Sequence, residues 1–273
     1  MFIPPTIKVI QGYIPEFYKY FNTEDVVSID TEAKRLTCYY PNLISIKGDN
    51  ITYLHYLQKP KKRKLGEDPI FPRKLKYVSL RSYTRTIDGL REMNLTELII
   101  PHNGANIKLL RGMQLTKLCM LYTKDLTPLQ DMPLTEISIP NYHGNIESLR
   151  GMQLTKLHLG NTDDLSPLQG MPLTDLNIGY YEGNIEELRG MPLTKLRFNN
   201  IRDLTPLQGM PLTELIIMYY QGSLEPLRGM QLTKLHIWET NDLSPLVDMP
   251  LNKLNINFRT YKDDEIKKYL RQI

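Results

Sequence analysis

Residues 152–170 read Met-Gln-Leu-Thr-Lys-Leu-His-Leu-Gly-Asn-Thr-Asp-Asp-Leu-Ser-Pro-Leu-Gln-Gly, and the chain repeats this phrase with substitutions. The copies begin at methionines that are alternately 20 and 19 residues apart: Met93, Met113, Met132, Met152, Met171, Met191, Met210, Met230 and Met249. A fixed short period is typical of a solenoid, in which one supersecondary unit stacks on copies of itself. The sequence therefore predicts a solenoid over most of the chain.

One copy contains a strand and a short return segment. In Leu154-Thr-Lys-Leu-His-Leu159 the alternation of Leu157, His158 and Leu159 is the period of a half-buried strand. Ser166-Pro167 predicts the start of a helical turn, with Ser166 as the N-cap and proline in the first helical position. Gly170 is then expected to end that turn. The few residues available leave room for a single helical or 3-10 turn.

This pattern, L-x-x-L-x-L followed by a polar stretch and L-x-x-L, resembles the leucine-rich repeat family over roughly residues 73–258. The resemblance implies an α/β repeat fold, a solenoid with a parallel concave sheet and short helical or 3-10 turns on the convex side. The chain departs from the family where other residues mostly replace the asparagine that follows the strand: Thr123, Tyr142, Thr162, Tyr181, Ile201, Tyr220 and Thr240. Backbone groups at that turn therefore need other partners.

The alternation of 20 and 19 residues indicates that the repeating unit is a 39-residue pair. The shorter copies carry a phrase close to Asp-Asp-Leu-Ser-Pro. Each longer copy carries a glycine shortly after the strand, and a glycine suits a bulge that needs a positive φ. These glycines are Gly104, Gly144, Gly183 and Gly222.

Three regions follow from the period. Residues 1–72 do not fit it and are expected to form an N-terminal cap, with an irregular first strand at 40–46 and a basic loop. Residues 73–258 form the solenoid of about ten repeats. Residues 259–273 are expected to form a C-terminal capping helix, since Ile266, Tyr269, Leu270 and Ile273 share one helical face.

Equivalent residues of neighbouring repeats should lie about 4.8 Å apart across the sheet. The column before the second strand leucine alternates in sign and predicts a ladder of cross-strand ion pairs until its last two members. This column is Glu97, Lys117, Glu136, Lys156, Asp175, Lys195, Glu214, Lys234 and Lys253.

Variable residues on the exposed side of the strands, together with aromatic residues at the strand ends, suggest a binding surface. Tyrosines gather at one rim, at 122, 142, 180, 181, 219 and 220, with Trp238 close by. Alternatively, one tyrosine of each pair packs over the loop that contains the glycine. The residues predicted to bind a partner are Tyr122, His158, Tyr180, Arg197, Tyr219, His236 and Trp238.

The spacing argues against an enzyme, a metal site or a cofactor site. His158 and His236 share a column but lie four repeats apart, about 19 Å. Cys119 and His158 are two repeats apart, about 10 Å, too far to ligate one zinc ion. The glycines occur at the turns and loops of the repeats and do not form the pattern of a phosphate-binding loop.

We expect an intracellular protein, cytoplasmic or nuclear. The chain has no run of about 18 apolar residues, no secretory signal at its start and only two cysteines, Cys38 and Cys119. The excess of Lys and Arg lies before Met93, which argues against nucleic-acid binding by the solenoid. Part of that excess resembles a nuclear import signal, which would bind an import receptor: Lys59, Lys61, Lys62, Arg63 and Lys64. A solvated loop or a phosphate contact is the alternative.

The sequence thus predicts a non-enzymatic scaffold that recognises a protein partner through its concave sheet and aromatic rim. One alternative is a ubiquitin-ligase substrate adaptor, because three phrases resemble an F-box: Ile3-Pro-Pro-Thr-Ile-Lys-Val-Ile, Asp25-Val-Val-Ser-Ile and Ala33-Lys-Arg-Leu36. The other is a structural subunit of a larger assembly.

Overall fold

A computed structural model describes most of the chain from residue 75 onward and five short strands before it. The described residues are 6–9, 28–31, 35–38, 45–47, 53–57, 75–81, 88–100, 107–181, 183–238, 242–256 and 259–271. The chain divides into two compact units, Met1–Leu134 and Thr135–Ile273.

The first unit holds two parallel arrangements of strands. Three short strands pair in the order β1-β2-β4, with bounds Thr6–Val9, Ser28–Thr31 and Ser45–Lys47. Five more pair in the order β3-β5-β6-β7-β8, with bounds Arg35–Cys38, Tyr53–Leu57, Tyr77–Arg81, Glu97–Ile100 and Lys117–Met120. The 3-10 turns of this unit are η2 (Asp88–Leu90), η3 (Ile107–Leu110) and η4 (Thr127–Leu129).

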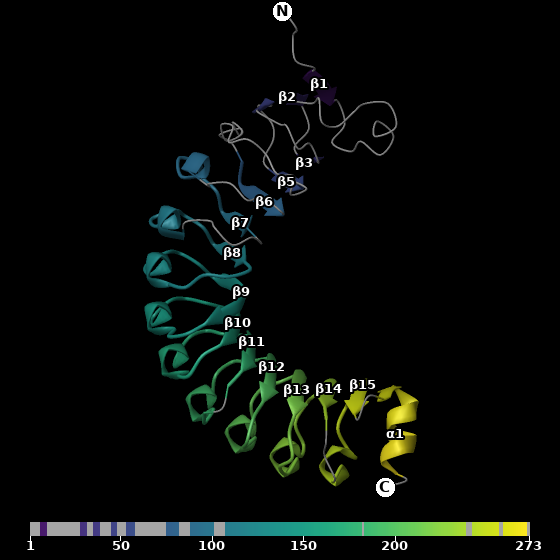
Figure 1. The fold of residues 1–273 in the computed structure, drawn as a ribbon. Coiled ribbons are helices and arrows are strands. Elements are labelled where there is room, and N and C mark those ends of the chain that lie inside the picture. The colour runs from purple at the N-terminus through teal and green to yellow at the C-terminus, as the bar shows by residue number, and fades with distance from the viewer. Residues whose placement is uncertain are drawn as a thin grey trace, which may run out of the picture. The chain divides into compact units, whose positions relative to one another are not determined.

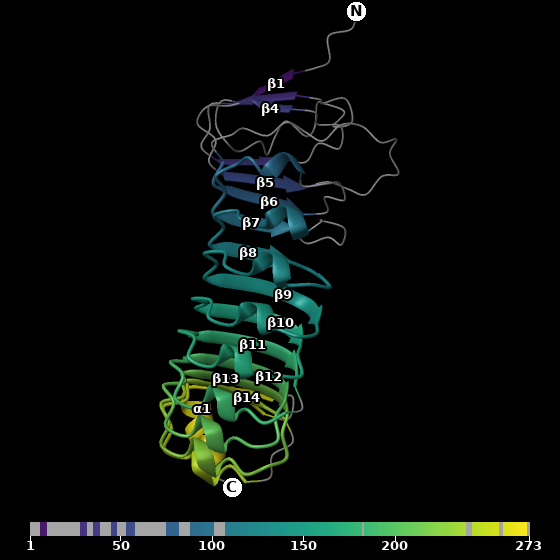
Figure 2. The same cartoon turned by 90° about the vertical axis from the view of Figure 1, so that its left-hand side faces the viewer.

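The second unit is a solenoid in which each parallel strand pairs with the next along the chain. Its strands are β9 (Glu136–His143), β10 (Lys156–Asn161), β11 (Asp175–Tyr180), β12 (Lys195–Asn200), β13 (Glu214–Tyr219), β14 (Lys234–Ile237) and β15 (Lys253–Ile256). The 3-10 turns are η5 (Glu147–Leu149), η6 (Ser166–Leu168), η7 (Glu186–Leu188), η8 (Thr205–Leu207), η9 (Glu225–Leu227) and η10 (Ser244–Leu246). Within this unit the strands line the inner, concave side and the turns the outer side (Figure 1). The strands follow one another in chain order (Figure 2). The predicted α/β solenoid is confirmed, and its repeat is compatible with the leucine-rich-repeat type.

Alternating burial explains why each repeat forms a strand. In β13 the buried Leu215 and Ile217 alternate with the partly exposed Glu214, Ile216 and Met218. The inward residues stack into a continuous core with the leucines of the 3-10 turns and with the repeated methionine, which is buried in every copy. Because each repeat buries its apolar face only against its neighbours, the stack as a whole supplies the core.

A threonine ladder runs beside the core and holds the repeats in register. The Thr135 carbonyl accepts hydrogen bonds from the backbone N–H groups of Thr155 (2.8 Å) and Lys156 (3.1 Å). The Thr155 hydroxyl donates to the same oxygen (3.2 Å). The same hydroxyl-to-carbonyl bond recurs from Thr174, Thr194, Thr213 and Thr233 to the preceding threonine. The Leu-Thr step of the repeat therefore satisfies a carbonyl at the edge of each strand.

In the shorter copies an aspartate two residues ahead of the 3-10 turn caps it, and not the predicted serine. In η6 the backbone N–H and the hydroxyl of Ser166 both donate to the carboxylate of Asp164, each at 2.8 Å. Ser166 is the first residue of the turn and not its N-cap. An aspartate two residues ahead of the turn recurs at Asp125, Asp203 and Asp242. The expected stop at Gly170 is confirmed, since its φ is 75°.

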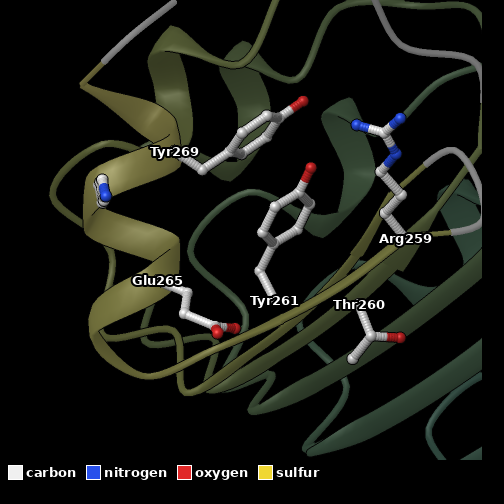
Figure 3. Close-up of a pocket in the computed structure, with 6 residues that line it drawn as sticks. Arg259, Thr260, Tyr261, Glu265 and Tyr269 are labelled. Carbon is white, nitrogen blue, oxygen red and sulfur yellow. The ribbon is translucent and has the colours of Figure 1, made fainter.

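The chain ends in an antiparallel strand and a helix. Strand β16 (Arg259–Lys262) pairs with β15, and helix α1 (Asp264–Leu270) follows with Ile266 and Leu270 buried. The rings of Tyr261 and Tyr269 stack, with centroids 4.2 Å apart. They line a hollow of about 530 Å³ between β16 and α1. Figure 3 shows both hydroxyl groups directed toward the side on which Arg259 lies.

Candidate interaction surface

Outward side chains at equivalent positions of neighbouring strands form columns on the concave face of the second unit. The middle column includes Ser138, His158, Asn177, Arg197, Ile216, His236 and Asn255, at equivalent positions of β9 to β15. Of these, Arg197 is exposed and the others are partly exposed. The assignment of this column to the outward side is therefore confirmed.

The charged column forms some of the predicted ion pairs. Lys156 lies 3.0 Å from Glu136, and Lys234 lies 3.4 Å from Glu214. In the first unit Lys117 lies 3.8 Å from Glu97. In each pair the lysine contacts the acid of the preceding strand. Such exposed pairs contribute little to stability individually. Because opposite charges lie side by side only in the observed alignment, we infer that the column mainly favours the correct strand register.

The adjacent tyrosines divide into a buried and an exposed residue. Tyr181 and Tyr220 are 5% and 4% exposed, whereas Tyr180 and Tyr219 are 44% and 53% exposed. The buried hydroxyls donate to the carbonyls of Asn184 and Ser223, each at 2.8 Å, and Tyr142 makes the equivalent bond to Asn145. Burial raises the pKa of Tyr181 to about 12, so its hydroxyl is a neutral donor at physiological pH. In each pair the first tyrosine, Tyr180 or Tyr219, is therefore the exposed one.

The buried tyrosines also correct the expected role of the loop glycines. Gly183 and Gly222 do not have a positive φ, and Gly144 does, at 150°. At Gly222 an added Cβ would lie 2.5 Å from the Tyr220 hydroxyl, and Gly183 faces the Tyr181 hydroxyl in the same way. These two glycines are therefore required by the close approach of a ring, not by backbone conformation.

An aromatic cluster gathers three of the predicted residues, Tyr219, His236 and Trp238. The rings of Tyr219 and Trp238 meet edge to face with centroids 5.5 Å apart. The His236 ring lies 5.8 Å from that of Trp238. Tyr219 comes from the end of β13, and His236 and Trp238 come from β14 and the residue after it. Edge-to-face packing holds these two large rings in a fixed arrangement.

Arg197 influences both histidines of the middle column. Burial lowers the pKa of His236, and the positive charges of Arg197 and Lys253 lower it further. Burial likewise lowers the pKa of His158, with a further lowering by Arg197 that Asp175 opposes. His158 also lies 3.3 Å from the Ser138 hydroxyl through its Nδ1 atom. Both imidazoles are therefore neutral at physiological pH and can accept or donate hydrogen bonds.

The other predicted residues lie outside this cluster. Tyr180 lies at the end of β11, two strands before Tyr219, about 10 Å across the sheet. Tyr122 belongs to the first unit and is partly exposed. The cluster is thus narrower than the seven-residue surface predicted from the sequence.

The sequence carries a signal for two features of the structure: the threonine ladder, which was not predicted, and the buried tyrosine, which was the alternative prediction for the rim. The threonine ladder corresponds to the Thr that follows the first leucine in nearly every copy. The buried tyrosine corresponds to a Tyr-x-Gly spacing in three longer copies, at Tyr142, Tyr181 and Tyr220. Because the Tyr-x-Gly spacing recurs in the longer copies, it distinguishes the buried tyrosines from the exposed ones that precede them.

Some predicted elements cannot be placed. The basic loop, with Lys59, Lys61, Lys62, Arg63 and Lys64, lies outside the described residues. The phrases that resemble an F-box are described only in part, where they overlap β1, β2 and β3.

Comparison of the chain with family models and with curated proteins finds no match. Within the described part of the chain, no three His, Cys, Asp or Glu side chains are grouped as a metal ion would require. No helix among the described residues has the length and apolar character needed to cross a membrane.

Proposed function

We propose that the protein is a non-enzymatic scaffold that binds a protein partner through the concave sheet of its second unit. The observation that carries this proposal is the Tyr219–Trp238 pair beside His236. Tyr219 is 53% exposed and packs against a second aromatic ring, although the adjacent Tyr220 is buried. Large, rigid aromatic side chains supply contact area at low entropic cost and are enriched in protein interfaces.

The charges of the concave face fit a scaffold better than a catalyst. Its lysines and acids pair along the sheet, at Lys156–Glu136 and Lys234–Glu214. Catalysis requires ionisable groups that converge on one reacting atom. Side chains spread along a column at strand spacing, about 4.8 Å per step, instead offer many contacts to one long partner.

The test is affinity selection of a phage-displayed library of random 16-residue peptides on the full-length protein. We expect selected peptides to bind at least tenfold more weakly to Trp238→Ala and Tyr219→Ala, with unchanged melting temperatures, because truncating an interface anchor costs about 2 kcal/mol or more. The matched control is Arg228→Ala on the convex side of the same repeat as Tyr219, which should bind normally. Peptides that lose affinity with Arg228→Ala and not with Trp238→Ala would place the binding surface on the convex side.

A further inference from the structure

The charge ladder breaks at the C-terminal end of the sheet. Through β14 each lysine follows an acid, but Lys253 of β15 is aligned with Lys234 on one side and with Lys262 of β16 on the other. Three lysines therefore occupy adjacent register positions. Lys234 pairs with Glu214, and among the described residues no carboxylate forms an ion pair with Lys253 or Lys262. Like charges directly opposite one another destabilise a sheet, so this row needs an explanation.

Protection of the sheet edge explains only part of the row. Lysines on an edge strand discourage pairing with other chains, which accounts for Lys262 on β16, the last strand of the sheet. It does not account for Lys253, because β15 is an interior strand. Glu265 lies beside Lys262 and accepts a hydrogen bond from its backbone N–H (3.3 Å), but among the described residues it forms no ion pair with the Lys262 ammonium group. A bound anion would compensate both ammonium groups.

We infer that the partner contacts this surface with an acidic, extended segment whose apolar side chain packs on Tyr219 and Trp238 and whose carboxylates bind Lys253 and Lys262. This inference rests on the proposed function and specifies the partner of the same surface. Lys253 and Lys262 are both exposed and lie on the two strands that follow the aromatic cluster. His236, Asn255 and Thr260 occupy the middle column between the two sites.

The geometry sets the spacing within the segment. Trp238 lies four residues along β14 from Lys234, the position aligned with Lys253, and four residues span about 13 Å. One or two strand steps of about 4.8 Å across the sheet bring the separation to about 14–16 Å. An extended chain advances about 3.3 Å per residue, so four or five residues should separate the apolar side chain from the acids.

A nucleic acid fits this surface less well. Phosphates bind along continuous lines of cations, and each bound phosphate adds to the salt dependence of affinity. Here the acids Asp175 and Glu214 alternate with lysines over the preceding strands. The lysine row is confined to β14, β15 and β16, which suits two carboxylates better than a run of phosphates.

The decisive variant is Lys253→Glu, because it separates binding from stability. An acid at this position restores the alternation between Lys234 and Lys262, so the melting temperature should stay the same or rise. The same change should weaken the selected peptides at least tenfold, since it places a carboxylate against theirs. Lys156→Glu is the control for the charge change: it replaces a lysine of the same column that pairs with Glu136 (3.0 Å), and it should lower the melting temperature, because it aligns three acids, while leaving affinity unchanged.

The peptides selected from the random library supply the readout, measured as Kd by fluorescence polarisation. We expect Asp or Glu to be enriched four or five residues from an aromatic or large apolar residue, and affinity to fall with added salt. Peptides that depend on Trp238 but carry no acids, or that bind Lys253→Glu normally, would overturn this inference and leave the proposed function standing. Peptides indifferent to Trp238 and Tyr219 would overturn both. Displacement of the peptides by a 20-nucleotide dT strand that itself binds through Lys253 would assign the surface to nucleic acid.

Discussion

Single residues in the longer copies depend on one another across the loop. Tyr220 places its ring against the loop and donates a hydrogen bond to the Ser223 carbonyl, while Gly222 leaves the space that the ring occupies. In the shorter copies a threonine takes this role as hydrogen-bond donor to the loop: the Thr162 hydroxyl donates to the Asp164 carbonyl (3.2 Å). Tyrosine and threonine thus supply the polar partners that asparagine would supply in the leucine-rich repeats this chain resembles.

We predict that Gly222→Ala destabilises the protein by about 1–3 kcal/mol, because the new Cβ would push the Tyr220 ring out of its place. An added Cβ would lie 2.5 Å from the Tyr220 hydroxyl oxygen and 2.6 Å from Cζ. Denaturant unfolding measures the change.

Gly89→Ala is the matched control for that change, since no atom lies within 4 Å of its added Cβ. It should alter stability little. In a Tyr220→Leu background Gly222→Ala should cost much less than in the wild type. Equal costs in the two backgrounds would show that the ring and the glycine are independent.

The 3-10 turns are capped in two ways that alternate along the chain. The shorter copies use an aspartate, as Asp164 does for η6. The longer copies use Asn145, Asn184 or the hydroxyl of Ser223 for the same N–H group. The longer copies also carry an ion pair within the turn, Arg189–Glu186 and its equivalents at Arg150–Glu147 and Arg228–Glu225. Each short element is therefore stabilised locally as well as by the stack.

We predict that Asp164→Ala lowers the melting temperature, because the Ser166 N–H loses its acceptor at the start of η6. Asp163→Ala is the matched control, since Asp163 is exposed and forms none of the described hydrogen bonds or ion pairs. Asp164→Asn, which keeps an acceptor oxygen, should fall between the two. A loss as large for Asp163→Ala as for Asp164→Ala would contradict the capping role.

The same prediction has a pH dependence with a defined sign. The Ser166 backbone N–H, followed by its hydroxyl, lowers the pKa of Asp164 below its ordinary value. The carboxylate therefore stabilises the fold above its unfolded pKa of about 3.9, and this contribution is lost as the pH falls through the lower, folded value. The difference in melting temperature between the wild type and Asp164→Ala should accordingly shrink in acid.

At the scale of the whole molecule, the basic segment at residues 59–64 can be tested separately from the solenoid. If residues 59–64 form an import signal, replacing Lys61, Lys62, Arg63 and Lys64 with Ala should move a tagged protein from the nucleus to the cytoplasm. The physical reason is the loss of a cluster of positive charges that an import receptor binds. Imaging in eukaryotic cells measures the shift, and a matched melting temperature controls for folding. Unchanged distribution would rule out the signal.

Periodicity made the fold predictable, whereas the details of the site depended on packing between repeats. The alternation in Leu154–Leu159 indicates which side chains face the core, and Leu157 is buried while His158 is partly exposed. Tyr219 and Tyr220 are adjacent and chemically identical, and only the Tyr-x-Gly spacing at Tyr220 distinguishes them in the sequence. The structure shows which of the two is buried: the Tyr220 hydroxyl donates to the Ser223 carbonyl, and Tyr219 stays exposed. The row of three lysines could not be predicted from the sequence, because it depends on the antiparallel pairing of β16 that brings Lys262 opposite Lys253.

Because charge and loop type alternate from one repeat to the next, the solenoid can gain or lose repeats without disruption only in certain numbers. Strands with an acid in the charged column belong to the copies with a Tyr-capped or similar long loop, and strands with a lysine belong to the Asp-capped copies. Loss of one copy by unequal recombination would bring two acids or two lysines side by side and two loops of one kind together. Loss of a 39-residue pair would leave every acid strand beside a lysine strand and every long loop beside a short one. Natural length variants of this solenoid should therefore differ by whole pairs.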